Sequence, residues 1–151
     1  MKKPISALLV YDQSNSLDGL KLALEGQFIR TSQARTCREA WHALSAANPP
    51  HLVFTGTTLP DGTWAEVLFL AARAPAFVNV IVVAGLPDVK FYVQVIERGA
   101  FDFIAPPFVA GELAHVVRCA ADNVLSRRNA RTRFERSGSH PLLSPLEPPS
   151  N

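Results

Sequence analysis

Few side chains in this sequence have the types and spacing that catalysis or metal binding requires. The two cysteines, Cys37 and Cys119, have no metal-ligand spacing and are typical of reduced, half-buried thiols. Asp12 stands alone after an apolar run, and Asp61-Gly62 is typical of a turn. The histidines form no triad with a serine or cysteine; they are His42, His51, His115 and His140. We therefore expect no catalytic residue, no metal site and no enzymatic activity.

The strongest local charge is a run of arginines near the carboxyl end of the chain. Residues 126–136 hold five arginines and one glutamate, whereas residues 1–125 hold 10 basic and 11 acidic side chains. The net charge of +2 excludes a strongly basic nucleic-acid binder as a description of the whole chain. The run could contact nucleic acid or an acidic partner, or it could be a solvated helix end. The candidate contact residues are Arg127, Arg128, Arg131 and Arg133.

Apolar strand patterns and helical patterns alternate five times along the chain. The predicted strands span residues 7–11, 28–31, 51–55, 78–84 and 100–105, and the predicted helices span residues 17–25, 37–47, 63–74, 87–98 and 109–128. Ser14 or Ser16, the capping box from Thr36 to Glu39, and Pro87 mark helix starts. The helical spacing also places Leu22, Trp41 and Trp64 on faces that pack against the core.

Alternation at this spacing predicts an α/β fold with a parallel sheet that is covered by helices on both faces. In such a sheet, ligands bind at the carboxyl ends of the strands. Those ends are Tyr11-Asp12, Gly56, Ala84-Gly85 and Ala105-Pro106.

The length of 151 residues and the 48% apolar content fit one domain with its own core. We divide the chain into a domain over 1–125, an arginine-rich extension of the last helix over 126–136, and a disordered proline- and serine-rich tail over 137–151. No apolar run reaches the roughly 18 residues that a transmembrane helix needs. We expect a cytoplasmic protein without a membrane partner.

Three stretches of the sequence resemble the receiver domain of bacterial two-component response regulators. They are Leu8-Leu9-Val10-Tyr11-Asp12, the segment from Pro50 to Gly62 that contains Leu-Pro-Asp-Gly, and Gly99-Ala100-Phe101-Asp102-Phe103-Ile104 with Pro107-Phe108. The likeness covers about residues 5–122. It implies a doubly wound (βα)5, flavodoxin-like three-layer sandwich with strand order 2-1-3-4-5 and a place in a phosphorelay.

The resemblance also implies five phosphorylation-site positions, and four of them have lost their chemistry. Tyr11 replaces one of two metal-binding acids, Gly56 the phosphoacceptor aspartate, Ala84 the hydroxyl residue and Pro106 the lysine. Only Asp12 remains. Without the carboxylate nucleophile no aspartyl phosphate forms, and one lone Asp is a poor Mg²⁺ site. We therefore expect a degenerate receiver that needs no cofactor and binds Mg²⁺ weakly or not at all.

Such a module would act through protein–protein interaction. The family implies the face formed by the fourth helix, fifth strand and fifth helix, with Phe91, Tyr92, Val95 and Phe103, and a homodimer is one possible outcome. Alternatives are residual phosphoryl acceptance or anion binding by Thr55, Thr57 or Thr58, and nucleic-acid contact by the arginine run. We do not expect nucleic acid to be the main partner.

Single residues of the altered site carry further expectations. Asp12 is expected to cap the first helix. The ring of Tyr11 is expected to fill the vacated pocket while its hydroxyl stays in water. Phe103 is expected to be a fixed surface or interface aromatic, and Pro106-Pro107 is a candidate cis peptide.

Overall fold

The computed structural model describes residues 4–12, 17–85 and 88–136. The predicted helix start at Ser14 or Ser16, Pro87 and the predicted tail over 137–151 lie outside the described residues.

Five parallel strands form the central sheet. They are β1 (Ser6–Val10), β2 (Arg30–Ala34), β3 (Leu52–Thr55), β6 (Asn79–Val83) and β7 (Asp102–Ile104), in the order β2-β1-β3-β6-β7. Counted along the chain this is the order 2-1-3-4-5, so the predicted topology is confirmed. The predicted loop after β3 holds a small antiparallel hairpin of β4 (Thr58–Leu59) and β5 (Gly62–Thr63).

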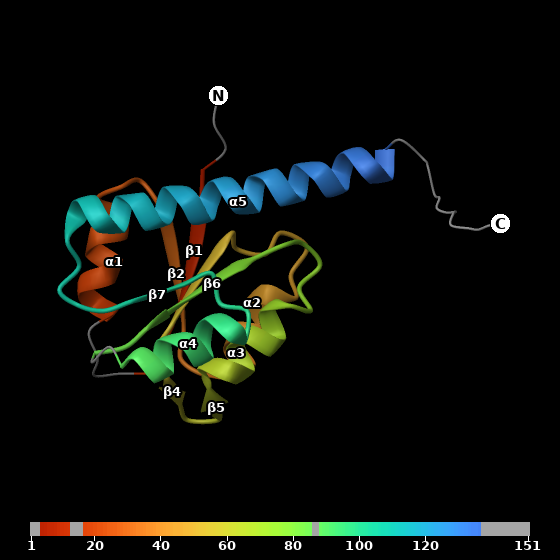
Figure 1. Cartoon of the computed structure of the whole chain (residues 1–151). Coiled ribbons are helices and arrows are strands. Elements are labelled where there is room, and N and C mark those ends of the chain that lie inside the picture. Colours follow the sequence, from red (N-terminus) through yellow and green to blue (C-terminus); the bar gives the residue numbers. More distant parts are fainter. Residues whose placement is uncertain (1–3, 13–16, 86–87, 137–151) are drawn as a thin grey trace.

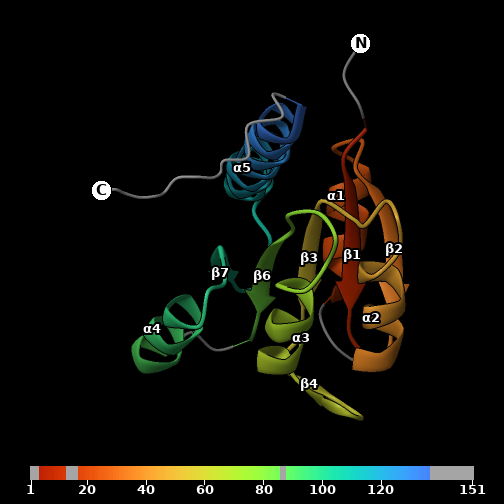
Figure 2. The same cartoon turned by 90° about the vertical axis from the view of Figure 1, so that its right-hand side faces the viewer.

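Helices cover both faces of this sheet, as the flavodoxin-like prediction requires. The helices are α1 (Leu17–Glu25), α2 (Cys37–Leu44), α3 (Trp64–Ala71), α4 (Val89–Glu97) and α5 (Ala110–Arg136). Leu9 and Phe54 pack in one cluster with α1 and α5, whereas Leu8 and Val53 pack in another with α2 and α3. Because neighbouring strand residues point to opposite faces, this alternation defines three layers. Figure 2 shows α5 on the side of the sheet away from α2, α3 and α4.

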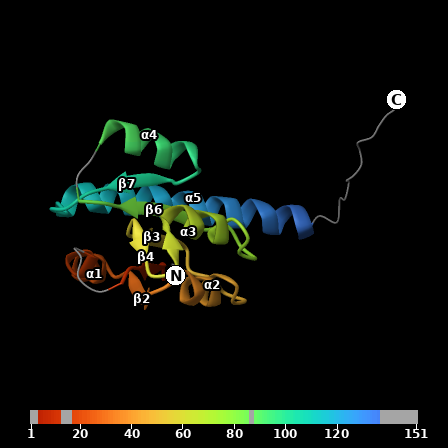
Figure 3. The ribbon, with the colours of Figure 1, turned by 90° about the horizontal axis from the view of Figure 1, so that it is seen from below.

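The helices are also distributed along the width of the sheet. Figure 3 shows α1 and α2 near the β2 end and α4 near the β7 end. Val95 of α4 packs with Trp64 of α3 and Val82 of β6 in a third buried cluster. Gly99 follows the last turn of α4 and has a φ of 108°, a backbone conformation that glycine adopts without strain.

Several predicted boundaries and burial assignments are wrong for local reasons. The second strand begins at Arg30 rather than Phe28, because Phe28 lies in the turn after α1 with a φ of 63° and is 92% exposed. Leu22 is exposed because it lies two positions from both Leu20 and Leu24, on the other side of α1. Trp41 is also exposed, whereas Trp64 is buried as predicted.

Four of the five helices differ from their predicted ranges, and α2, α3 and α4 are all shorter than predicted. Thr63 is the N-cap of α3 rather than its first residue, and its side chain accepts a hydrogen bond from the Ala65 N–H. Helix α5 runs to Arg136, so it continues past the helix predicted over 109–128 through the segment 126–136 that was expected to extend it. Figure 1 shows its last turns extending past the sheet, and these turns carry the arginine run. No helix among the described residues combines the length and apolar character needed to cross a bilayer.

Candidate functional site at the carboxyl edge of the sheet

The strand ends that the sequence singles out lie along one edge of the sheet. The Gly56 N–H donates to the Val10 carbonyl at 2.9 Å, and the Ala84 N–H donates to the Ile104 carbonyl at 3.1 Å. These bonds continue the parallel ladders by one residue. The structure therefore brings the predicted positions Tyr11, Gly56 and Ala84 to a common edge.

Tyr11 belongs to the core at this edge. Its side chain is 4% exposed and packs in the cluster that includes Leu17 and Leu113. The side chains of α1 and α5 therefore enclose the residue. An aromatic ring stands where the resemblance implies a metal-binding acid.

Asp12 is the one carboxylate among the five predicted phosphorylation-site positions, and it is half-buried. Its predicted role as a cap of α1 involves residues 13–16, which lie outside the described residues. Over the described part of the chain, no group of three His, Cys, Asp or Glu side chains is placed to hold a metal ion.

The threonines near Gly56 differ in their availability. The Thr55 hydroxyl is fully buried and donates to the Gly56 carbonyl at 2.9 Å. Thr57 is half-buried, and Thr58 is exposed in β4. Of the three hydroxyls considered as substitute phosphoryl acceptors, that of Thr55 is therefore enclosed and bonded to the backbone.

Two other carboxylates that lie near this edge act as caps at the starts of helices. Asp61, in the β4–β5 turn, accepts hydrogen bonds from the backbone N–H groups of Cys37 at 2.7 Å and Arg38 at 3.1 Å. Asp88 accepts one from the Lys90 N–H at 3.0 Å. The bond from the Cys37 N–H, followed by that from Arg38, lowers the pKa of Asp61. Asp61 is therefore more than the turn residue that the sequence predicts.

The predicted capping box at α2 is present in an altered form. The Thr36 hydroxyl accepts from the Glu39 N–H at 3.0 Å, and the Glu39 carboxylate accepts from the Arg35 N–H at 2.8 Å. Together with Asp61 these bonds satisfy several N–H groups at the start of α2. The contribution of Asp61 was missed because it comes from 24 residues along the chain, where no local pattern reveals it.

The two cysteines lie in different environments, so the prediction that both are half-buried is wrong. Cys37 is buried, and Cys119 is exposed. Burial, followed by the nearby Asp61 carboxylate, raises the pKa of Cys37 to about 11. A Cβ at Gly62 would lie 2.8 Å from the Cys37 sulfur, so this hairpin packs tightly on α2. Cys37 is thus an unreactive, packed thiol.

Among the predicted interaction residues, Val95 is the clear error. It is fully buried beneath α4, because it faces Trp64 and Val82. Phe91 and Phe103 are half-buried and meet edge to face with ring centroids 5.6 Å apart. Tyr92 is 45% exposed and its ring centroid lies 6.1 Å from that of Phe103. Only Tyr92 of the four presents a large exposed surface.

The peptide bond between Pro106 and Pro107 is cis. Pro106 is half-buried and Pro107 is exposed at the end of β7. The position implied for a phosphate-binding lysine is therefore occupied by a ring that has neither a charge nor an N–H donor.

The arginine run lies at the opposite edge of the sheet and is not simply a solvated helix end. Arg128 is half-buried and donates to the carbonyls of Phe77 at 2.8 Å, Pro50 at 2.9 Å and Pro49 at 3.3 Å. Its burial lowers the pKa of the guanidinium, which nonetheless stays charged. The Nε and Nη2 groups of Arg128 therefore bind loops of this chain, a role within the fold that the sequence does not predict.

The remaining predicted basic contacts differ in their surroundings. Arg127 is exposed and lies over the Phe77 ring at 4.8 Å. Arg131 is exposed and donates to the Pro75 carbonyl at 3.0 Å. Arg133 lies further along α5.

Comparisons with known proteins point to one kind of domain. No protein-family model matches the chain. The chain is 30% identical over 145 residues to the nitrogen assimilation regulatory protein NtrX of Azorhizobium caulinodans, a match that covers 90% of this chain and 30% of that protein. It is also 30% identical over 115 residues to the response regulator protein PilR of Pseudomonas aeruginosa, covering 76% of this chain and 25% of PilR. The chain thus matches about a third or less of the length of these two relatives.

A solved structure supports the same relationship at the level of the fold. A CheY-like response regulator receiver domain from Methanospirillum hungatei superimposes with a TM-score of 0.68 at 22% identity, covering 82% of this chain and 98% of that one. The chain therefore has the receiver fold, and its homologues are response regulators.

Proposed function

We propose that this chain is a receiver-like module of two-component signalling that accepts no phosphoryl group and acts by binding a protein. The observation that carries the proposal is the loss of chemistry at the carboxyl edge. Tyr11 is part of the core, Gly56 and Ala84 offer no functional group, and Pro106 replaces a cation. The similarity to response regulators supports the signalling class.

Phosphoryl transfer depends on a nucleophile and on neutralisation of developing negative charge. At this edge neither the aspartate nucleophile nor the lysine is present, and Asp12 is the one remaining acid of the predicted set. The proposal therefore assigns no enzymatic activity and no cofactor to the chain. It places the module in the cytoplasm, where phosphorelay proteins of this class would meet it.

The proposed interaction face is on α4. Val89 is 79% exposed, and Tyr92 and Val93 are each 45% exposed. Their i, i+3 and i+4 spacing puts them on one stripe of the helix. An exposed apolar stripe of this kind is typical of a protein-binding surface. A second copy of this chain is the partner that we propose to test first.

The first experiment tests phosphoryl acceptance. The full chain is incubated with acetyl phosphate and Mg²⁺, and its intact mass is measured. We expect the mass to be unchanged. A stoichiometric phosphoryl adduct would contradict the proposal, and peptide mapping would then show whether Thr57 or Thr58 carries it.

The second experiment tests the α4 face by sedimentation velocity over a range of concentrations. We expect concentration-dependent dimers that a Tyr92→Asp, Val93→Asp variant no longer forms. Gln94→Asp is the matched control, because Gln94 is exposed on the same helix and lies outside the apolar stripe. A strict monomer at high concentration would exclude self-association through this face.

A further inference from the structure

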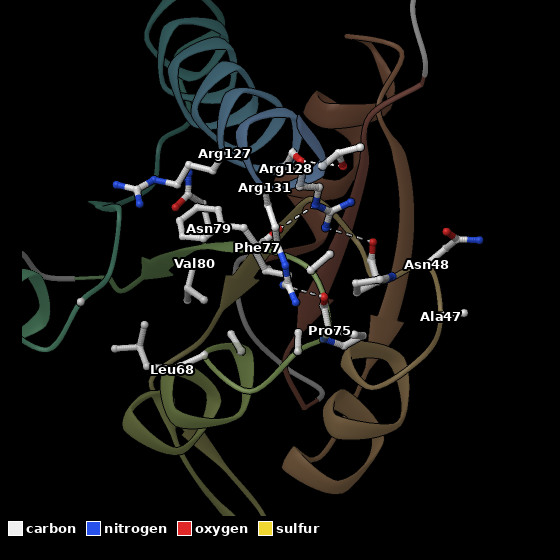
Figure 4. A pocket seen from close by; sticks show the side chains of 18 of the residues that line it. Ala47, Asn48, Leu68, Pro75, Phe77, Asn79, Val80, Arg127, Arg128 and Arg131 are labelled. Carbon is white, nitrogen blue, oxygen red and sulfur yellow. Dashed lines mark hydrogen bonds between the residues drawn. The ribbon is translucent and has the colours of Figure 1, made fainter. Parts of the chain in front are cut away.

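A groove opens at the amino-terminal edge of the sheet, opposite the altered phosphorylation site. It has a volume of about 840 Å³ and lies between the α2–β3 connection, the end of α3 with the segment leading into β6, and the last turns of α5. Figure 4 shows Arg128 and Arg131 reaching from α5 toward the loops that carry Phe77 and Pro75. None of the residues at the carboxyl edge or on the α4 stripe lines this groove.

Arg128 holds the walls of the groove together. Its guanidinium reaches the Pro49 and Pro50 carbonyls on one wall and the Phe77 carbonyl on the other. Asn79 adds a second tie, since its side-chain amide donates to the Ala120 carbonyl at 3.0 Å and to the Asn123 side chain at 2.8 Å. These bonds link loops far apart in the sequence to α5, so the groove is a built feature of the fold.

The charged side chains that line the groove are all positive. Among the residues that the structure describes, four arginines and no aspartate or glutamate line it; the arginines are Arg98, Arg127, Arg128 and Arg131. Arg128 is committed to the walls, whereas Arg127 contacts the Phe77 ring with one face and is exposed to solvent. The rest of the lining includes apolar residues, namely Leu68, Ala71, Val78 and Val80. A cationic rim therefore surrounds a partly apolar floor.

We propose that this groove binds an acidic peptide segment of a partner protein, with carboxylates on Arg127 and Arg131 and apolar side chains on the floor. Charge complementarity supports an anionic occupant, because arginine pairs well with carboxylates. The inference goes beyond the proposed function and does not depend on it. It concerns a second surface at the other edge of the sheet.

A single-stranded nucleic acid fits the groove less well than an acidic peptide. Such ligands need exposed aromatic rings on which bases stack and a basic track along the backbone. Here Arg127 covers the Phe77 ring, and Trp64 is buried. The chain before residue 126 has slightly more acidic than basic side chains, so the positive surface does not continue as a long track.

The test is a titration of the ¹⁵N-labelled full chain with short synthetic peptides, followed by NMR. One peptide alternates glutamates with leucines, a second has lysines in place of the glutamates, and a third has serines in place of the leucines. We expect saturable shifts of Ala76, Phe77, Gly99 and Thr132 amides with the first peptide only, and weakening at high salt. Absence of saturable shifts at these amides, or equal binding of the lysine peptide, would overturn the proposal.

Charge reversals locate the site. Arg127→Glu and Arg131→Glu are each expected to weaken binding of the glutamate–leucine peptide by about tenfold or more. Arg118→Glu is the matched control, because Arg118 is exposed on the same helix and does not line this groove. If loss of the Pro75 contact unfolds Arg131→Glu, Arg127→Glu keeps the test valid, and a thermal melt checks its folding.

Two further outcomes would overturn the assignment to a partner protein. One is a single-stranded DNA oligonucleotide that competes with the peptide and binds more tightly than it does. The other is a chain truncated after Arg136 that binds the peptide much more tightly than the full chain, which would show that residues 137–151 are the natural occupant. The α4 dimer and acetyl phosphate experiments have separate readouts, so they succeed or fail independently of this test.

Discussion

The two edges of the central sheet use charged residues in opposite ways. At the carboxyl edge, the strand-end positions carry Tyr11, Gly56 and Ala84, and the nearby carboxylates of Asp61 and Asp88 cap helices. At the amino-terminal edge, Arg128 penetrates between two loops and binds three backbone carbonyls. At the edge that carries the ligand site in doubly wound folds, Asp12 is the one carboxylate among the five predicted positions, whereas a groove lined by four arginines opens at the opposite edge.

This difference indicates that the fold and the phosphorylation chemistry are separable. The alternating apolar faces that build the three layers do not depend on the strand-end residues. A cluster of aspartates carries a cost in like-charge repulsion, and a buried Tyr11 avoids that cost. The chain therefore keeps the architecture of a receiver while its polar contacts serve packing and capping.

The largest expected loss of stability follows from a substitution at the amino-terminal edge of the sheet. Arg128→Ala removes a charged donor from three carbonyls, and hydrogen bonds of charged groups contribute about 1.5–3 kcal/mol each before partial replacement by water. We expect the free energy of unfolding to fall by about 3 kcal/mol, measured by urea denaturation.

Arg127→Ala is the control for this change, because Arg127 makes an exposed contact with a ring and reaches no wall carbonyl in the hydrogen bonds described. Its loss should cost less than about 1 kcal/mol. Equal stability of the wild type and Arg128→Ala would show that the groove walls do not depend on this side chain.

The next largest loss of stability is expected when a substitution introduces a carboxylate at the carboxyl edge. Gly56 is buried, so Gly56→Asp places a carboxylate at a buried position and should cost about 2 kcal/mol at neutral pH. Burial would raise the pKa of the new carboxyl above the roughly 3.9 of an unfolded aspartate. The loss of stability should therefore be small below that pH and should grow as pH rises through the raised pKa.

Gly85→Asp provides the comparison at the same edge, because Gly85 is exposed and a Cβ there would meet nothing within 4 Å. Thermal unfolding of both variants at acidic and neutral pH gives the contrast. A Gly56→Asp variant as stable as Gly85→Asp at neutral pH would mean that the edge still accommodates a charge.

A smaller effect concerns the cap that Asp61 provides for α2. Asp61→Ala should lower the melting temperature, since the Cys37 and Arg38 N–H groups lose their acceptor. The pKa of Asp61 is lowered in the folded protein, so its contribution is present above the unfolded value of about 3.9 and is lost as pH falls through the folded pKa. The wild type and the variant should therefore converge in strongly acidic buffer.

The control for this change is Asp122→Ala, because Asp122 is exposed within α5. It should leave the melting temperature nearly unchanged at neutral pH. A pH-independent difference between the wild type and Asp61→Ala would point to packing of the hairpin, rather than the carboxylate, as the source of stability.

The order of strands could be predicted from the sequence because buried parallel strands and amphipathic helices leave regular patterns. The strand ends that the sequence singles out could also be located, since Tyr11 and Gly56 directly follow Val10 and Thr55, whereas their assignment as phosphorylation-site positions rests on the family resemblance. Phe28 was misplaced because its left-handed conformation ends the turn after α1, and an apolar side chain gives no sign of that.

Contacts between distant segments could not be predicted in the same way. In the sequence, Arg128 looks like one more cation of an exposed run. Its partial burial becomes visible only when α5 is packed on the loops before β3 and β6. Asp61 reads as a turn residue until the hairpin is placed on α2. The sequence does not show that Val95 is buried, because the buried face of α4 depends on where this helix meets Trp64.

The most direct test of the central claim is an NMR titration of the wild-type chain with Mg²⁺ and beryllofluoride, which mimics a bound phosphoryl group. We expect the amide resonances of Asp12, Gly56, Ala84 and Ala105 to stay in place, whether the two are added singly or together. Saturable shifts at these amides that need both Mg²⁺ and beryllofluoride would contradict the account, because they would show that the altered edge still forms a phosphoryl site.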